Sequence, residues 1–565
     1  MEAGKQTGRR ENSFLKGALI LSIAGLVVRF IGAFFRIPLA NLLSVEAMSY
    51  YSSAYPIFAF FIAVATTGFP TAVARLIAEY KALGKTSTIR VIYDSCLMLM
   101  LIICGIGFLV TLLFADSIAV AIGNEGAALS LKVLAPGILF CGLLSVYRGY
   151  FQGFQFMNPF AVSMVVEQFI RVLFGLSLAA ILVSVGDEWA AAGATMGATI
   201  GGFVALVYIF WRYRKLSSKW MLYNPLGDKI NVKSRTTVHD DLSIIFVKDK
   251  PTDRRTIINR TLRIAVPITI SASIIPFISI IDVAMVVNRL TDIGFTPERA
   301  KEMFTMMSAY AGTLLNFPMA IISGLQISVV PAVTAVFSLG KPKEVRKLIK
   351  SALKVNSLIT LPSSVGLAVL SVPIIHLLYP THNELVGKTG EILTTLAFSV
   401  FFLGGFLVST GIYQAIEKTT VPVQNLLIGV AVKIGLTYIL TGIYELNIIG
   451  ACIASVTCYF VAWLLNMLRL RVYTDVDYDL PNTYVKPLVA SVLMGIVCML
   501  VYHGVYLVIP RNSISTLVAI MAGMAVYLFL ILVLRVLRKD DYELLPAGSK
   551  IKAIEQRLFK NRAAK

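Results

Sequence analysis

Long apolar runs separated by short polar segments repeat along almost the whole chain. A helix crosses the hydrocarbon core of a bilayer with about 20 mainly apolar residues, and about fourteen of the runs reach that length. The pattern therefore predicts an all-α polytopic membrane protein with about fourteen transmembrane helices. We expect the spans near residues 15–43, 50–74, 90–114, 127–150, 159–184, 190–212, 262–288, 303–337, 352–378, 391–416, 421–441, 447–470, 485–508 and 514–537.

The composition supports this prediction. Of all residues, 57% are hydrophobic and only 15% are charged, whereas soluble domains average about 25% charged residues. The net charge of +20 could suit a nucleic-acid-binding surface, but the cations are concentrated in alternate loops and the acids lie in the loops between them. This is the positive-inside distribution of a membrane protein. It predicts that both termini are cytoplasmic, and it removes the reason to expect a nucleic-acid partner.

The two halves of the chain resemble each other in sequence. Matching glycine, alanine, phenylalanine and arginine residues in the ranges 193–214 and 450–471 are all separated by 257 residues. The cations Arg171 and Lys433, each deep in a predicted span, are separated by 262 residues. Many transporters are built from such repeats and bind substrate at the repeat interface near the midplane. We therefore expect two pseudo-symmetric six-helix bundles, followed by two C-terminal helices.

These patterns divide the chain into six predicted parts. They are an N-terminal cytoplasmic tail (1–13), an N-terminal lobe with spans one to six (14–215), a cytoplasmic linker (216–256), a C-terminal lobe with spans seven to twelve (257–472), the last two spans (484–538) and a cytoplasmic tail (539–565).

Two arginines lie within the first predicted span. The span contains no acid, and the next acid after the two arginines is Glu46. Arg29 and Arg36 share a helix face with Gly25 and Gly32 at spacing i, i+4, i+7 and i+11. A charge at bilayer depth costs about 2.5 kcal/mol or more and almost always faces a protein interior or a wet cavity. Because a guanidinium donates bidentate hydrogen bonds to phosphate, we predict that both arginines bind an anionic substrate. The alternative hypothesis for Arg36 is that its side chain extends to the membrane interface and places the guanidinium there.

Four further ionisable residues lie within predicted spans. Glu167 and Arg171 have the i, i+4 spacing of a helix ion pair, and they either neutralise each other or act in coupling or gating. Lys433 has no acid within one turn of its own helix and needs a partner from another span. Asp282 could supply that partner or could bind a cation, so a structural pair and a coupling site both remain open.

The sequence offers no clear catalytic or metal-binding constellation. The histidines are scattered and the cysteines lie in apolar segments, without zinc-ligand spacing. They are His239, His376, His382, His503, Cys96, Cys104, Cys141, Cys452, Cys458 and Cys498. Asp475 and Asp477 form an Asp-x-Asp pair like those that hold metal in some glycosyltransferases, but they lie in a short loop with no nucleotide-binding domain. We expect buried unpaired thiols, a solvated acidic loop, no catalytic residues, no metal and no cofactor other than a candidate coupling cation, Na⁺ or H⁺.

The segment Tyr147–Pro159, followed by Val166–Arg171, carries a resemblance to a known family. The chain resembles the polysaccharide-biosynthesis exporters that include stage V sporulation protein B and the MurJ-type lipid II flippases, in the multidrug/oligosaccharidyl-lipid/polysaccharide exporter superfamily. The resemblance implies a location in the bacterial plasma membrane and a V-shaped cavity between lobes. It also implies an undecaprenyl-diphosphate-linked substrate, with Arg29 and Arg36 matching the first-helix arginines that contact the diphosphate.

Three function classes compete. The first is a flippase that moves a lipid-linked cell-wall precursor outward by alternating access, acting as a monomer among membrane lipids. The second is a cation-coupled small-molecule antiporter of the same superfamily, which would need acids in its cavity where the first span offers arginines. The third is a membrane glycosyltransferase or ligase that uses Asp475 or Asp477.

Overall fold

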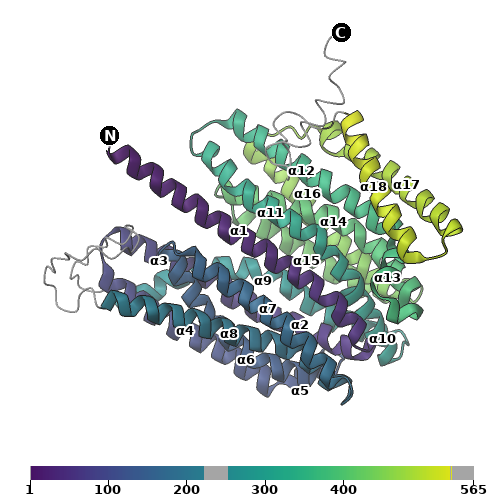
Figure 1. Ribbon diagram of the computed structural model, residues 1–565, viewed down its shortest axis with the longest axis horizontal. Coiled ribbons are helices and arrows are strands. Elements are labelled where there is room, and N and C mark those ends of the chain that lie inside the picture. The colour runs from purple at the N-terminus through teal and green to yellow at the C-terminus, as the bar shows by residue number, and fades with distance from the viewer. Residues whose placement is uncertain (1, 222–251, 535, 537–565) are drawn as a thin grey trace, which may run out of the picture. The chain divides into compact units, whose positions relative to one another are not determined.

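Helices make up almost all of the structure, a computed structural model that describes residues 2–221, 252–534 and 536 (Figure 1). In this part of the chain, 14 helical segments are long and apolar enough to cross a membrane, and no strand occurs. The predicted fold class and number of spans are therefore confirmed. Most of the predicted linker (216–256) and the whole predicted C-terminal tail (539–565) lie outside the described residues.

The helices have the following bounds, where η marks a π- or 3₁₀-helix. They are α1 (Glu2–Leu42), α2 (Val45–Thr66), α3 (Gly68–Ala82), α4 (Thr86–Leu113), α5 (Ala115–Ala121), α6 (Ala127–Gly153), α7 (Met157–Leu182), α8 (Asp187–Met221), α9 (Arg254–Asp292), α10 (Pro297–Thr305), η1 (Met306–Ala311), α11 (Gly312–Phe337), α12 (Pro342–Val369), α13 (Ser371–Leu378), η2 (Pro380–Leu385), α14 (Val386–Ala415), α15 (Thr420–Thr441), α16 (Asn447–Thr474), η3 (Pro481–Val485), α17 (Lys486–Val508) and α18 (Asn512–Val533).

The chain forms two compact units. The first unit comprises Met1–Gly32 and Tyr50–Ile280, and the second comprises Ala33–Ser49 and Ile281–Lys565. The divisions fall inside α1, α2 and α9, so each of these three helices contributes residues to both units. The lobe boundaries expected from the sequence repeat stay a prediction.

Two predicted spans are interrupted by prolines. The span expected over 50–74 is divided at Thr67 into α2 and α3, and the span expected over 352–378 is divided at Leu370 into α12 and α13. A proline ring clashes with the carbonyl group four residues earlier in a helix. The rings of Pro70 and Pro373 therefore disfavour a continuous helix through Thr66 and Val369, the residues just before the two breaks. The span expected over 303–337 contains a third irregularity, the π-helix η1.

Small residues let the helices of the first unit pack closely. A Cβ atom added at Gly197 of α8 would lie 2.4 Å from the Arg171 carbonyl oxygen, and one added at Gly201 would lie 2.6 Å from the Glu167 carbonyl oxygen. Glycine at both positions therefore allows α8 to lie directly against the backbone of α7. Helices in membranes commonly associate through such small residues, because hydrocarbon provides no hydrophobic driving force between them.

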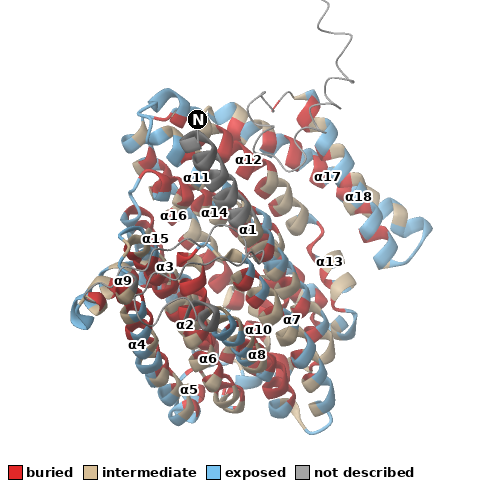
Figure 2. Cartoon of the chain, turned by 60° about the vertical axis from the view of Figure 1, so that its left-hand side comes forward, coloured by how far each residue is buried: buried red, intermediate tan, exposed pale blue. Residues whose placement is uncertain are grey.

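The second unit has an apolar core among α11, α12, α14 and α16, crossed by buried amide and hydroxyl groups. Asn425 of α15 donates to the side-chain oxygen of Asn466 at 2.7 Å, and Asn466 donates to the Ser409 hydroxyl group at 2.8 Å. These side-chain hydrogen bonds connect three helices where lipid could not satisfy the polar groups. Elsewhere the exposed positions of the membrane helices carry large apolar side chains, as on α4, α8, α17 and α18 (Figure 2), which suits contact with hydrocarbon.

Candidate functional site

Helix α1 presents the two predicted substrate-binding arginines on one face. Arg29 and Arg36 are seven residues apart in an unbroken helix, which separates their Cα atoms by two turns, or about 10 Å. The Arg29 side chain is exposed, and no ion pair or hydrogen bond to another described residue holds it. Gly32 lies between the two arginines on α1, and a Cβ atom added there would lie 3.1 Å from the side-chain amide nitrogen of Gln168 on α7. The glycine therefore lets this face of α1 approach α7.

The environment of Arg36 differs from that of Arg29. Arg36 is partly buried, and its guanidinium lies close enough to Tyr379 to influence the phenol. Burial raises the pKa of Tyr379, and the positive charge of Arg36 opposes that rise. The neighbouring Phe34 ring contacts Phe317 edge-on, with ring centroids 5.3 Å apart. Arg36 thus lies in a partly aromatic environment within the second unit.

The C-terminal end of α1 is tied to the segment between α13 and α14. Asn41 donates to the Leu378 carbonyl oxygen at 2.7 Å, and the Thr381 hydroxyl group donates to Asn41 at 3.0 Å. The His382 ring nitrogen Nε2 lies 2.8 Å from the Ala40 carbonyl oxygen and must be its donor. These contacts fix the helix end that follows Arg36, so the guanidinium extends from a braced backbone.

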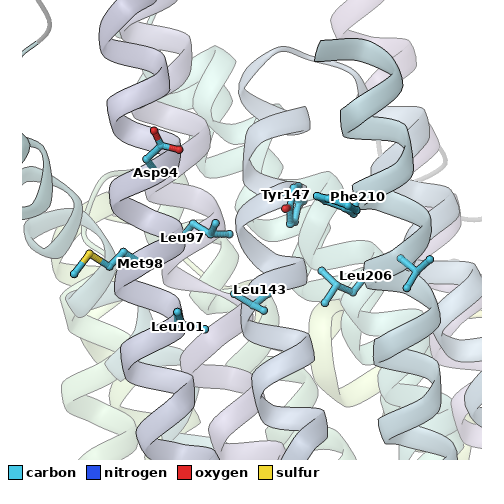
Figure 3. Close-up of a pocket in the computed structure, with 9 residues that line it drawn as sticks. Asp94, Leu97, Met98, Leu101, Leu143, Tyr147, Leu206 and Phe210 are labelled. Atoms are coloured by element: carbon cyan, nitrogen blue, oxygen red, sulfur yellow. The ribbon is translucent and has the colours of Figure 1, made fainter. Parts of the chain in front are cut away.

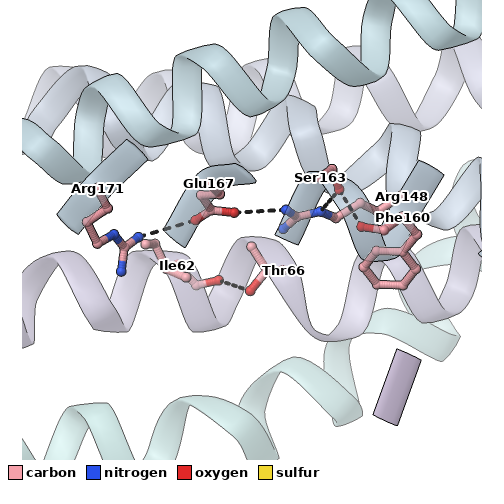
Figure 4. Close-up of polar contacts among 7 residues, drawn as sticks. All are labelled: Ile62, Thr66, Arg148, Phe160, Ser163, Glu167 and Arg171. Atoms are coloured by element: carbon pink, nitrogen blue, oxygen red, sulfur yellow. Dashed lines mark hydrogen bonds and ion pairs between the residues drawn. The ribbon is translucent and has the colours of Figure 1, made fainter. Parts of the chain in front are cut away.

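Glu167 is the centre of a buried three-residue charge cluster in the first unit (Figure 4). Its two carboxylate oxygens lie 2.9 Å from Arg148 Nη2 and 3.2 Å from Arg171 Nη2. Arg148 also donates to the Ser163 hydroxyl group, and Arg171 also donates to the Tyr55 hydroxyl group. The predicted Glu167–Arg171 pair is confirmed. With Arg148 the cluster carries an excess of one positive charge and connects α2, α6 and α7.

Asp282 and Lys433 form the second predicted pair, within the second unit. Lys433 Nζ donates to Asp282 Oδ2 at 2.7 Å, and only 3% of the lysine side chain and 17% of the aspartate side chain are exposed. Lys433 therefore obtains the partner from another span that the sequence required. Because the ammonium group neutralises the carboxylate, a metal cation that binds Asp282 would meet the positive charge of Lys433.

Lys433 lies in the middle of a buried polar stripe on α15. Asn425, Gly429, Lys433, Thr437 and Thr441 follow at four-residue intervals and are all buried. Among the described residues, no hydrogen-bond partner is found for the Thr437 and Thr441 hydroxyl oxygens or for the Asn425 side-chain oxygen. Such groups are costly in a membrane interior. This stripe is therefore one part of the second unit where buried polar atoms lack hydrogen bonds.

We expect removal of either charge at the Asp282–Lys433 pair to destabilise the protein. The variants Asp282→Asn and Lys433→Met each leave one buried charge unpaired, which costs about 3 kcal/mol. The double variant removes both charges and should recover much of the lost stability. Thermal unfolding of the purified protein in detergent measures this. If the double variant is as unstable as the sum of the single variants, the two side chains do not act as a pair.

Asp475 and Asp477 face cations of α12 rather than a metal site. Asp475 Oδ2 lies 3.2 Å from Arg346 Nη1, and Asp477 Oδ2 lies 3.7 Å from Lys350 Nζ. Both aspartates are highly exposed, so each ion pair contributes little. These contacts agree with the expected solvated acidic loop.

The other candidate metal ligands do not assemble. Within the described residues, no group of three or more histidine, cysteine, aspartate or glutamate side chains could hold a metal ion. All six cysteines are buried and free, which confirms the expected unpaired thiols. The expectation that no cofactor is needed stays a prediction.

Sequence reasoning did not select Arg148 as a site residue. It lies 19 residues from Glu167 on a different helix, so helix periodicity alone cannot pair them. One signal was available: Arg148 is an ionisable residue at the start of the segment that carries the family resemblance. The structure brings together Arg148, Glu167 and Arg171 in the first unit, and Asp282 and Lys433 in the second. It assigns Arg29 to the first unit and Arg36 to the second.

Comparison with known proteins confirms the resemblance. A family model described as polysaccharide biosynthesis protein matches residues 14–338, and one described as MatE matches residues 306–439. The lipid II flippase MurJ of Bacillus subtilis (strain 168) is 25% identical and covers 92% of this chain and 95% of its own length. Stage V sporulation protein B of the same organism is 27% identical and covers 95% of this chain and 98% of its own length.

Solved structures show the same fold. The inward closed conformation of lipid II flippase MurJ superimposes with a TM-score of 0.63 at 18% identity, covering 91% of this chain and 98% of that chain. The inward-facing conformation of a MATE-family multidrug resistance transporter of the MOP superfamily gives a TM-score of 0.63 at 16% identity, covering 80% of this chain and 98% of that chain.

Proposed function

The chain belongs to the polysaccharide biosynthesis protein family, and we propose that it moves an undecaprenyl-diphosphate-linked cell-wall precursor from the inner to the outer leaflet of a bacterial plasma membrane. Its relatives are flippases and transporters of the same superfamily, and the 14 apolar helical segments among the described residues support a multi-pass membrane protein. We propose that the substrate is lipid II or a related lipid-linked oligosaccharide, bound by the protein within the membrane lipids. The proposal also includes cytoplasmic termini and action as a monomer.

The observation that carries the proposal is the arginine face of α1. Arg29 and Arg36 carry two guanidinium groups on residues two helical turns apart within a single membrane span. A guanidinium matches the oxygens of a phosphate in geometry and charge. Two such groups offset much of the cost of moving a diphosphate through a low-dielectric region.

The proposed mechanism is alternating access. The headgroup binds the α1 arginines from the cytoplasmic leaflet, the lobes rock, and the headgroup leaves on the other side while the lipid tail remains in the bilayer. An inside-negative potential favours outward movement of an anion by about 2.3 kcal/mol per charge per 100 mV. The positive charges of two arginines nearly cancel the negative charge of a diphosphate, so the loaded site carries little net charge. The potential then acts on the return of the empty carrier or on a coupled cation, Na⁺ or H⁺.

The two buried charge clusters are proposed to act in coupling or gating. Glu167 with Arg171, and Asp282 with Lys433, each hold opposite charges inside a unit where separating them is costly. A conformational change that keeps the two charged side chains in contact is therefore favoured over one that separates them. Proton or cation binding at a carboxylate would lower that barrier.

Complementation tests the proposed function. A bacterium depleted of its lipid II flippase activity should regain growth when it expresses this chain, and precursor should cease to accumulate on the cytoplasmic face of its membrane. Continued accumulation despite correct insertion of the protein would contradict the proposal.

A cation-coupled small-molecule antiporter is the second candidate. The MatE family model matches residues 306–439, and a multidrug resistance transporter shares the fold. An antiporter for cationic drugs would use acids in its binding cavity, whereas the membrane span of α1, Ile23–Leu42, carries the exposed Arg29 and no acid. Drug-resistance assays in a pump-deficient strain distinguish the two: resistance without complementation would support the antiporter.

The Asp-x-Asp pair gives a separate test against an enzymatic function. We expect Asp475→Ala and Asp477→Ala to retain full complementing activity, because both carboxylates are highly exposed and, among the described residues, each pairs with one partly buried cation of α12. Complementation with each variant at matched expression measures this. Loss of activity with normal protein levels would revive the glycosyltransferase or ligase hypothesis.

A further inference from the structure

A membrane-facing groove in the first unit contains none of the α1 arginines and none of the residues of the two charge clusters. It has a volume of about 500 Å³ and lies among α4, α6 and α8 (Figure 3). Its lining is apolar except for one carboxylate and one phenol, and consists of Asp94, Leu97, Met98, Leu101, Leu143, Tyr147, Leu206, Val207 and Phe210. Met98, Leu101 and Val207 are each about half exposed. The groove is therefore open to the surface that the membrane helices present to lipid.

One end of the groove is surrounded by arginines. Arg254 Nη2 lies 2.7 Å from Met98 Sδ, and the Arg214 guanidinium lies 4.8 Å from the centre of the Phe210 ring. Two of the lining side chains are thus directly contacted by cations. Arg90 lies on α4 one turn before the groove, 3.8 Å from Asp94.

Asp94 is the one acid among the lining residues, and Arg90 pairs with it. Arg214 and Arg254 contact two other lining side chains, and all four charged side chains are exposed. The cations come from the start of α4, the end of α8 and the start of α9, three positions that belong to the predicted basic loops. The positive-inside distribution places them at the headgroups of the cytoplasmic leaflet.

We propose that this groove binds an anionic phospholipid of the cytoplasmic leaflet, with an acyl chain along the apolar lining and the phosphate among Arg90, Arg214 and Arg254. Basic pockets between membrane helices on the cytoplasmic side bind anionic headgroups in this way. The volume is within the range of about 300–1,000 Å³ that is typical of small-ligand sites. Complementary charge selects an anionic headgroup over a zwitterionic one, and Asp94 remains neutralised by Arg90.

Native mass spectrometry of the full-length protein, with added phosphatidylglycerol or phosphatidylcholine, tests the proposal. The triple variant Arg90→Ala/Arg214→Ala/Arg254→Ala should bind phosphatidylglycerol at least about tenfold more weakly, because each cation near a headgroup contributes about 1 kcal/mol. A control triple variant removes the same number of positive charges elsewhere, at the exposed residues Arg75, Arg263 and Lys343. It should bind phosphatidylglycerol as the parent protein does.

A second variant keeps the arginines and fills the groove. Val207→Trp places an indole ring at an exposed lining position, with little risk to the fold, and should reduce binding of phosphatidylglycerol. A photoreactive amino acid at Leu101 should capture a phospholipid in native membranes. The proposal is overturned if the groove and control triple variants bind alike, if phosphatidylcholine binds as strongly as phosphatidylglycerol, or if the photoreactive group captures a polyprenyl lipid or a protein segment instead.

Discussion

Cells that depend on this protein as their flippase should stop growing when Arg29 or Arg36 is replaced by alanine. Each change removes charge-assisted hydrogen bonds to the diphosphate, worth about 1.5–3 kcal/mol per bond, from a region where water cannot replace them. Transport should therefore fall by about tenfold to a hundredfold for each variant. Growth and the amount of precursor on the cytoplasmic face, at matched protein levels, measure the effect.

Two control variants make this test specific. Arg511→Ala removes an exposed arginine in the loop between α17 and α18 and should complement fully. Lysine at position 29 or 36 keeps the charge but loses the planar fork, so it should give an intermediate rate. Normal growth of both alanine variants would mean that the α1 arginines do not bind the substrate.

Glu167→Gln should cause the largest loss of stability among single changes in the first unit. The glutamine keeps the shape of the side chain but leaves Arg148 and Arg171 without a countercharge at buried positions. Removing one partner of a buried pair costs about 3–5 kcal/mol. We expect a clearly lower midpoint of thermal unfolding in detergent and reduced insertion in cells.

Changes to the two arginines test the same cluster with a smaller expected effect. Arg148→Met leaves the Glu167–Arg171 pair in place, and Arg171→Met leaves the Glu167–Arg148 pair in place. In both variants the remaining charges balance. If either is less stable than Glu167→Gln, charge balance does not determine the stability of this cluster.

Much of the fold could be predicted from hydropathy, because a transmembrane helix needs about 20 mainly apolar residues whatever its tertiary contacts are. The helix breaks and the π-helix could not be predicted from hydropathy. The breaks at Thr67 and Leu370 follow from prolines that window-averaged hydropathy ignores, although Pro70 and Pro373 were visible in the sequence. The π-helix η1 lies within the span predicted over 303–337, where hydropathy alone does not distinguish a π-helix from an α-helix.

The ion pairs within one helix could be predicted from the sequence more fully than those between helices. Glu167 and Arg171 share a helix, so spacing sufficed, and they lie 3.2 Å apart. Lys433 needed a partner from another span, and Asp282 was a candidate, but its position depended on packing. Arg148 was missed for the same reason, since its contact with Glu167 crosses from α6 to α7. The roles of Arg29, Arg36 and both clusters in transport stay predictions.

Translocation by the purified protein in proteoliposomes tests the central claim most directly. Fluorescent undecaprenyl-diphosphate-linked muropeptide would be placed in both leaflets, and its appearance at the outer surface followed with an external quencher. We predict rapid translocation by the parent protein and loss of translocation in the Arg29→Ala/Arg36→Ala double variant. Equal translocation by parent, double variant and protein-free liposomes, or by parent and double variant alone, would contradict the account.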